Sequence, residues 1–102
     1  MQISNIDINI DEYISFPDCC LIDVRSYEET KKEPFQAKCV SIPMDVLLND
    51  ISLIDINIVS VFICAAGIRS KYVAEIFRSQ GYQNVYSLKQ GVAELNHRLS
   101  SK

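Results

Sequence analysis

The pattern of apolar and polar positions is clearest in the second half of the chain. Residues 58–63 are almost continuously apolar and rich in β-branched side chains, which is typical of a central strand buried on both faces. Residues 70–80 show a helical repeat, with an apolar side formed by Val73, Ile76 and Phe77 and a polar side formed by Lys71, Glu75 and Arg78. Ser70 is a favourable N-cap, and Gly81 is a favourable C-terminal stop. The pattern therefore predicts a buried strand and an amphipathic helix joined by a short loop.

Shorter patterned segments predict the other elements of the chain. Strands are expected at 19–24, 39–42 and 84–87, and helical segments at 27–32, 44–48 and 92–99. Four apolar residues lie between the second helical segment and the central strand, and we expect their side chains to be buried against the core. They are Ile51, Leu53, Ile54 and Ile56. Strands that alternate with helices indicate an α/β fold with a parallel sheet. Right-handed crossovers then place helices on both faces of the sheet.

The loop between the central strand and its helix contains the strongest candidate for chemistry. Ligands of open parallel sheets bind at the carboxyl ends of the strands, and a helix N-terminus offers free N–H groups and a partial positive charge. Cys64 at this position is expected to have a lowered pKa. Gly67 permits a tight turn that aims successive N–H groups at one point. Arg69 adds a positive charge, and the small residues Ala65 and Ala66 leave the loop open.

Each of these residues also has a purely structural interpretation. A cysteine at the end of an apolar strand is often only a small buried hydrophobe. For Cys64, the neighbouring glycine, arginine and helix start favour the functional interpretation. Asp23 and Arg25 end the second strand at the same edge of the sheet, where we expect a supporting ion pair rather than a direct catalytic role. Adjacent Cys19 and Cys20 point to opposite faces of a strand and are expected to be packing residues.

Three segments in order resemble the rhodanese-type sulfurtransferases. Residues 64–70, Cys-Ala-Ala-Gly-Ile-Arg-Ser, are similar to the family's active-site loop Cys-x-x-Gly-x-Arg-Ser. Residues 21–25, Leu-Ile-Asp-Val-Arg, are similar to a family strand, and residues 81–92 are similar to its Gly-Tyr-x-x-Val-x-x-Leu-x-Gly-Gly segment. The resemblance covers nearly the whole chain, so we expect residues 1–102 to form one rhodanese-like domain.

The resemblance implies a fold and a reaction. It implies a five-stranded parallel sheet in the order 1-5-4-2-3, with a first strand near Gln2–Ser4 and a short helix over 11–16. Periodicity alone leaves this segment open, because Ile6, Ile8 and Ile10 alternate as in a strand. The implied reaction is sulfur transfer, in which Cys64 takes a sulfane sulfur from a donor such as thiosulfate and passes the resulting persulfide sulfur to a thiophilic acceptor. The loop N–H groups of residues 65–70 would stabilise the charge, and Arg69 would attract an anionic donor. No cofactor is implied.

The chain departs from the family pattern in three places. Residues 34–39 replace the usual Gly-His-Ile-Pro-Gly-Ala segment, which leaves no histidine near the loop to act as a general base. Gln90 replaces the first glycine of the Gly-Gly pair, and Leu95 lies near the position where the family commonly has tryptophan. The single histidine, His97, is expected on the exposed side of the last helix.

Composition excludes several other functions. A net charge of −3 over 102 residues gives no reason to expect nucleic acid or anionic membrane as a partner. The four cysteines, at 19, 20, 39 and 64, form no Cys-x-x-Cys pair, and one histidine adds little, so a metal site is not expected. The sequence shows no secretory signal pattern or bilayer-spanning run. Free thiols then favour the reducing cytoplasm.

Three other functions are weighed against a thiosulfate-using enzyme. Dual-specificity phosphatases of the same fold have five residues between the cysteine and the arginine, whereas four separate Cys64 from Arg69 here. The smaller ring suits sulfur better than a tetrahedral phosphate. A non-enzymatic binding or sensing module is a second alternative, although such modules usually lack the cysteine. A third is a persulfide carrier that exchanges sulfur with partner proteins. Separately, Cys39 is a possible resolving thiol near the site, although a core position is favoured for it.

Overall fold

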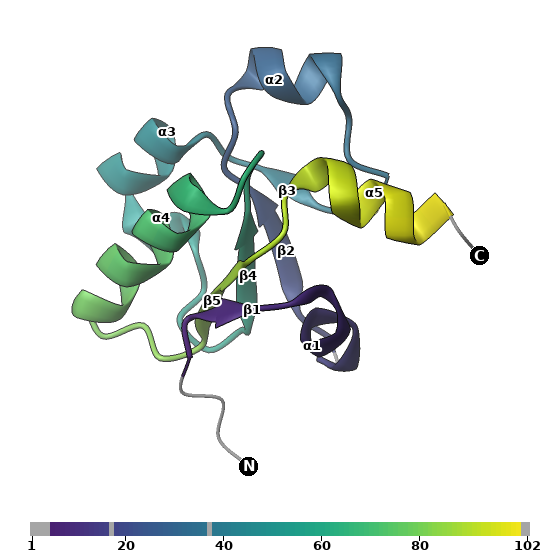
Figure 1. The fold of residues 1–102 in the computed structure, drawn as a ribbon. Helices are drawn as coiled ribbons and strands as arrows, with labels where there is room; N and C mark the ends of the chain where they lie inside the picture. Colours follow the sequence, from purple (N-terminus) through teal and green to yellow (C-terminus); the bar gives the residue numbers. More distant parts are fainter. Residues whose placement is uncertain (1–4, 17, 37, 101–102) are drawn as a thin grey trace.

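The apolar runs of the sequence form one parallel sheet. The computed structural model describes residues 5–16, 18–36 and 38–100. Its strands are β1 (Asp7–Ile8), β2 (Cys20–Asp23), β3 (Val40–Ser41), β4 (Ser60–Ile63) and β5 (Val85–Leu88). They are ordered β1-β5-β4-β2-β3, and every neighbouring pair is parallel (Figure 1). The predicted fold class and strand order are confirmed.

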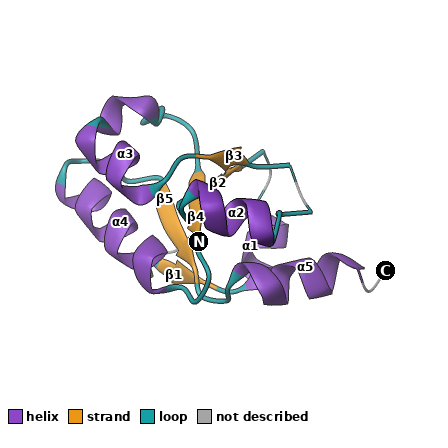
Figure 2. Ribbon diagram, turned by 90° about the horizontal axis from the view of Figure 1, so that it is seen from above, coloured by secondary structure: helices purple, strands orange, loops and turns teal. Residues whose placement is uncertain are grey.

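Helices cover both faces of this sheet. They are α1 (Ile10–Ser15), α2 (Tyr27–Lys32), α3 (Met44–Asn49), the 3-10 turn η1 (Ile51–Leu53), α4 (Ile68–Ser79) and α5 (Val92–Ser100). Helices α3 and α4 lie on one face and α1 and α5 on the other, while α2 lies over the carboxyl edge of the strands (Figures 1 and 2). Within the described ranges, no helix has both the length and the apolar character needed to cross a membrane.

Successive side chains of a strand point to opposite faces of the sheet, so the strands contribute to two hydrophobic cores, one on each face. In β4, Phe62 faces α3 and α4, and its ring centroid lies 5.2 Å from that of Phe77. Val61 and Ile63 face the other side, where they join the cluster that includes Leu95 of α5. All four residues of β4 are buried, as expected for a central strand that is covered on both faces. The strand therefore ends inside the protein, at the point where Cys64 follows it.

Several predicted boundaries need correction. The central strand begins at Ser60 rather than Ile58, whose side chain is exposed. The first strand is Asp7–Ile8, and the predicted segment Gln2–Ser4 lies outside the described residues. Of the apolar residues that precede the central strand, Ile54 is buried, but Leu53 and Ile56 are exposed. The expectation that these two side chains are buried is therefore wrong. They lie in a short turn and a loop, which direct them to solvent.

Helix α2 is short, and its start is defined by a capping box. The Ser26 side chain accepts a hydrogen bond from the Glu29 N–H, and the Glu29 carboxylate accepts one from the Ser26 N–H. A helix of six residues is too short to be stable alone. Contacts from the sheet must therefore hold α2 in place.

A buried ion pair supplies those contacts. The Arg25 guanidinium donates to both carboxylate oxygens of Asp23, and the two side chains are only 2% and 0% exposed. Asp23 also accepts a hydrogen bond from the Thr30 hydroxyl, and Arg25 donates to the backbone carbonyls of Glu29 and Glu33. The pair thus attaches α2 to the end of β2, which is the structural role that we expected.

A second attachment holds the segment that departs from the family pattern. The buried Asn96 of α5 accepts a hydrogen bond from the Gln36 N–H at 2.9 Å and donates to the Pro34 carbonyl at 3.0 Å. One amide side chain thereby satisfies two backbone groups of a loop that has no regular structure. Asn96 was not predicted to have this role, because an asparagine on an amphipathic helix normally faces solvent.

Removal of the Asp23 charge should destabilise the fold. In Asp23→Asn the buried Arg25 loses its counter-charge, and we expect the free energy of unfolding to fall by about 3 kcal/mol. Urea denaturation followed by circular dichroism measures this change. The exposed pair between Arg98 and Asp11 provides a matched control, and Asp11→Asn should have a much smaller effect. Equal effects of the two substitutions would contradict a supporting role for the buried pair.

Candidate active site

The candidate site is the loop that joins β4 to α4. Cys64 directly follows the last residue of the strand, and its side chain is buried. Gly67 takes the left-handed conformation, with φ of +83°, and is the residue that precedes the helix. The helix therefore begins at Ile68, and the expectation that Ser70 is the N-cap is wrong. Because Ser70 lies in the first turn, it is available for another role.

Close backbone packing fixes the shape of this loop. A Cβ atom on Gly67 would lie 2.5 Å from the carbonyl oxygen of Lys89, and one on Gly91 would overlap the carbonyl oxygen of Ala65. The N–H of Val92, at the start of α5, donates to the Cys64 carbonyl at 3.1 Å. The loop thus fits against the connection between β5 and α5. This contact explains why Gly91 is needed although Gln90 replaces the other glycine of the family pair.

Several hydrogen-bond donors converge on the sulfur of Cys64. The Gly67 N–H donates to Sγ at 3.1 Å, and the Ser70 N–H donates to it at 3.4 Å. The Ser70 Oγ lies 3.5 Å from Sγ. Such an arrangement favours a negatively charged sulfur over a neutral thiol. The structure therefore brings Cys64, Gly67 and Ser70 together, while Ala65 and Ala66 are exposed at the mouth of the loop.

These contacts change the acidity of the thiol. Burial by itself raises the pKa of Cys64, because a thiolate is poorly solvated inside a protein. The Ser70 hydroxyl and the N–H groups of Ser70, Ala66 and Gly67 act in the opposite direction. Their combined effect is larger, and the pKa of Cys64 lies below its ordinary value. The structure thus gives this cysteine the increased thiolate fraction that its position predicts.

Ser87 of β5 extends the hydrogen-bond chain behind the thiolate. Its hydroxyl lies 2.8 Å from that of Ser70, and both side chains are fully buried. When Ser70 donates to the thiolate, Ser87 must supply the proton of the hydrogen bond between the two hydroxyls. Ser87 was not among the predicted site residues. A serine inside the otherwise apolar strand Val-Tyr-Ser-Leu was the available signal, because a buried hydroxyl requires a partner.

Arg69 differs from its expected arrangement. Its guanidinium donates to both carboxylate oxygens of Glu29 in α2, at 2.6 and 2.8 Å. The hydrogen bond from Arg69, together with that from the Ser26 N–H, lowers the pKa of Glu29 to about 2. The carboxylate is therefore charged at neutral pH and neutralises Arg69. The two side chains are 36% and 38% exposed, so the pair lies at the rim of the site.

The remaining predicted residues lie outside the ring of donors. The side-chain hydrogen bonds of Asp23 and Arg25 go to each other, to α2 and to its C-cap residue Glu33, so these residues support the site through that helix. Cys19 and Cys20 pack against opposite cores, as expected, and Cys39 packs on the same side as Cys19. Burial raises the pKa of all three thiols. No cluster of potential metal ligands occurs among the residues that the structure describes.

Comparisons with known proteins show the family of this chain. A model of the rhodanese-like domain matches residues 9–97, and the chain belongs to this family. A rhodanese-related protein from Thermoplasma volcanium is 24% identical, with a TM-score of 0.77 over 90% of this chain and 91% of that chain. The human single-domain sulfurtransferase TSTD1 is 21% identical, with a TM-score of 0.75 over 97% and 99% of the two chains. The comparison with curated proteins gives no significant match.

A longer protein also contains a similar domain. The NAD-dependent persulfide reductase from A. fulgidus is 29% identical over 87% of this chain, but the match covers only 15% of that chain, with a TM-score of 0.69. The fold is thus found both alone and within larger proteins. These similarities establish the family and the fold, whereas the reaction must be inferred from the site.

The hydrogen bonds to Sγ should control the reactivity of Cys64. We expect alkylation of Cys64 by iodoacetamide to reach its half-maximal rate at a lower pH than alkylation of a free cysteine. Ser70→Ala should move this profile to higher pH, because the thiolate loses a donor, and Ser87→Ala should move it less in the same direction. Site-resolved mass spectrometry separates Cys64 from the other thiols. The exposed Ser79 at the far end of α4 is the control, and a shift of equal size in Ser79→Ala would refute the assignment.

The backbone of Gly91 packs so closely against that of Ala65 that position 91 should accept no side chain. Gly91→Ala forces the Ala65 backbone to move, and we expect a loss of about 3 kcal/mol in the free energy of unfolding together with a loss of the lowered pKa of Cys64. Gly81 gives a matched comparison, since it has φ of +95° but open space around its Cα. Gly81→Ala should cost only about 1–2 kcal/mol of backbone strain and leave alkylation of Cys64 unchanged. A normal Cys64 profile in Gly91→Ala would contradict the packing argument.

Proposed function

We propose that the protein is a sulfurtransferase that carries a sulfane sulfur as a persulfide on Cys64. The observation that carries the proposal is the convergence of N–H and hydroxyl donors from Gly67 and Ser70 on the Cys64 sulfur. Because these donors lower the pKa of Cys64, a larger fraction of it is present as the nucleophilic thiolate. The same donors can stabilise a charged sulfur that is bonded to Sγ. The exposed Ala65 and Ala66 leave room for the donor to approach.

The reaction proceeds in two displacements. The Cys64 thiolate attacks the sulfane sulfur of the donor, so that a new S–S bond forms and the bond within the donor breaks. With thiosulfate, the electron pair of the broken bond leaves as sulfite. An acceptor thiolate or cyanide then attacks the terminal sulfur, and Cys64 leaves as a thiolate. No net oxidation occurs, and a covalent intermediate divides one difficult transfer into two easier steps.

The proposed function also includes a compartment, a class of sulfur donor and a class of acceptor. We propose that residues 1–102 act as one domain in the reducing cytoplasm, where free cysteines persist. The sulfur donor would be a small sulfane compound or a persulfide-bearing protein, and a protein cysteine is a possible acceptor. Support comes from the family match and from structural neighbours described as single-domain sulfurtransferases. No step requires a metal or an organic cofactor.

The proposal is tested by replacing the cysteines in two groups. Cys64→Ser should reduce thiocyanate formation from cyanide and a sulfane donor to the uncatalysed background, because serine cannot form a persulfide. A variant with Cys19→Ala, Cys20→Ala and Cys39→Ala should keep its activity, since these thiols pack in the two cores. Thiosulfate and a cysteine persulfide should both be tried as donors. Activity that survives in Cys64→Ser, or that needs Cys39, would overturn the proposed mechanism.

A further inference from the structure

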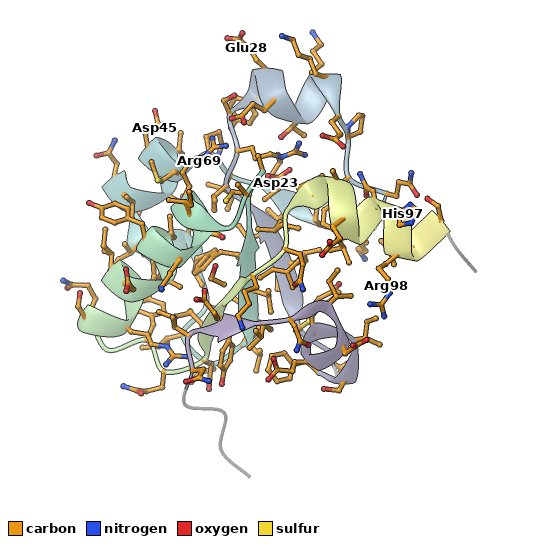
Figure 3. All side chains as sticks on the ribbon, viewed as in Figure 1. Asp23, Glu28, Asp45, Arg69, His97 and Arg98 are labelled. Carbon is orange, nitrogen blue, oxygen red and sulfur yellow. The ribbon has the colours of Figure 1, made fainter. Side chains whose placement is uncertain are left out.

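The entrance to the site is the opening of the Cys64 loop at Ala65 and Ala66, together with the Arg69–Glu29 pair at its rim. The charges around this entrance do not favour small anions. The positive charge of Arg69 is neutralised by the bidentate contact with Glu29. Two further carboxylates, on Glu28 of α2 and Asp45 of α3, are exposed at the same edge of the sheet. Figure 3 shows Asp45 and Arg69 near each other at this edge and Glu28 farther out on α2, so the three residues come from three different helices. A donor such as thiosulfate would thus approach carboxylates and a paired arginine rather than a free cation.

A cleft with acidic and apolar walls lies between α3 and α2, the helix that carries Glu29. Its volume is about 240 Å³, and it is lined by Ser26, Tyr27, Glu28, Pro43, Asp45 and Val46. The cleft thus separates the first turns of α2 and α3. Lys31 and Lys32 lie in the last turn of α2 and do not line it. Its charged groups are therefore carboxylates alone.

Exposed apolar side chains surround the same entrance. Ile68, which directly precedes Arg69, is 77% exposed, and Tyr27 at the start of α2 is 62% exposed. Val46 in the cleft wall and Tyr72, one turn after Ile68, are also exposed. Large apolar side chains that project to solvent around a reactive group are a common feature of protein-binding surfaces. The entrance thus combines apolar contacts with negative charge.

We propose that Cys64 exchanges sulfur with a cysteine of a polypeptide partner whose flanking residues are basic and apolar. The partner's apolar side chains would contact Ile68, Tyr27 and Val46, and its lysines or arginines would lie near Glu28 and Asp45. This inference rests on the proposed persulfide function and names its substrate class. The partner thiolate attacks the terminal sulfur of the Cys64 persulfide. The S–S bond to Sγ breaks, and its electron pair stays on Cys64.

The test compares two peptides as sulfur acceptors. Each has blocked termini and one cysteine between leucines, flanked by lysines in one peptide and by glutamates in the other. Cys64 is first loaded with excess polysulfide, which is then removed, and 2-mercaptoethanol serves as a neutral reference acceptor. We expect the second-order rate constant of this single-turnover transfer to be about tenfold higher for the lysine peptide at low salt. The ratio should fall as salt screens the charges.

The double variant Glu28→Gln/Asp45→Asn identifies the source of this preference. Lysines also increase the thiolate fraction of the peptide itself, and this effect is the same for every variant of the protein. The proposal is therefore tested by how far the double variant lowers the ratio of the transfer rates to the two peptides. We expect most of the tenfold ratio to disappear, while transfer to 2-mercaptoethanol is unchanged. Glu75→Gln is the matched control, because Glu75 is exposed on α4 about two turns beyond Ile68. It should keep the full ratio.

Each outcome separates the two proposals. Failure of Cys64 to accept any sulfur would reject the proposed function itself. Loading followed by equal transfer to both peptides, or a ratio that the double variant leaves unchanged, would reject only the basic polypeptide partner. A preference for the glutamate peptide would show that Arg69 remains available to anions in spite of Glu29. A preference for the lysine peptide that needs Glu28 and Asp45 would support the inference.

Discussion

The site depends on the hydrogen bonds that the loop directs at one sulfur atom. Gly67 and Ser70 donate to Cys64 Sγ only because the backbone turns sharply at Gly67, where φ is +83°. That turn is held by contact with the backbone around Lys89 and Gly91, which leaves no room for a side chain at either glycine. Burial would make the thiol less acidic, and the donors reverse this effect. The lowered pKa of Cys64 therefore follows from the Ser70 hydroxyl and from the backbone N–H groups that the turn directs at the sulfur.

A second chain of contacts connects the sheet with the rim of the site. Asp23 and Arg25 form a buried pair at the end of β2, and Arg25 binds backbone carbonyls of α2. This short helix supplies Glu29, which neutralises Arg69. Neither Asp23 nor Arg25 needs to contact a substrate to affect specificity. They position the helix that determines the charge at the entrance.

The sequence predicts more of the fold than of the site. Continuous apolar runs and helical repeats locate the sheet, and the family resemblance carried by the motifs around Cys64 and Gly91 implies the strand order. The shift of the central strand to Ser60 and the exposure of Leu53 and Ile56 were missed, because apolar residues in turns have no periodic signature. Contacts between residues far apart in the chain, such as Arg69 with Glu29, leave no local pattern. Ser87 is of this kind too, since only packing brings it to Ser70.

The central claim is that Cys64 carries the sulfur. Intact-mass spectrometry of the purified protein after treatment with a sulfane donor, followed by peptide mapping, tests it most directly. The account predicts a gain of one sulfur atom, located on Cys64 and lost after treatment with cyanide. Sulfur found on Cys19, Cys20 or Cys39 instead, or no gain with any donor, would contradict it. In the second case the rhodanese-like fold would serve binding rather than transfer.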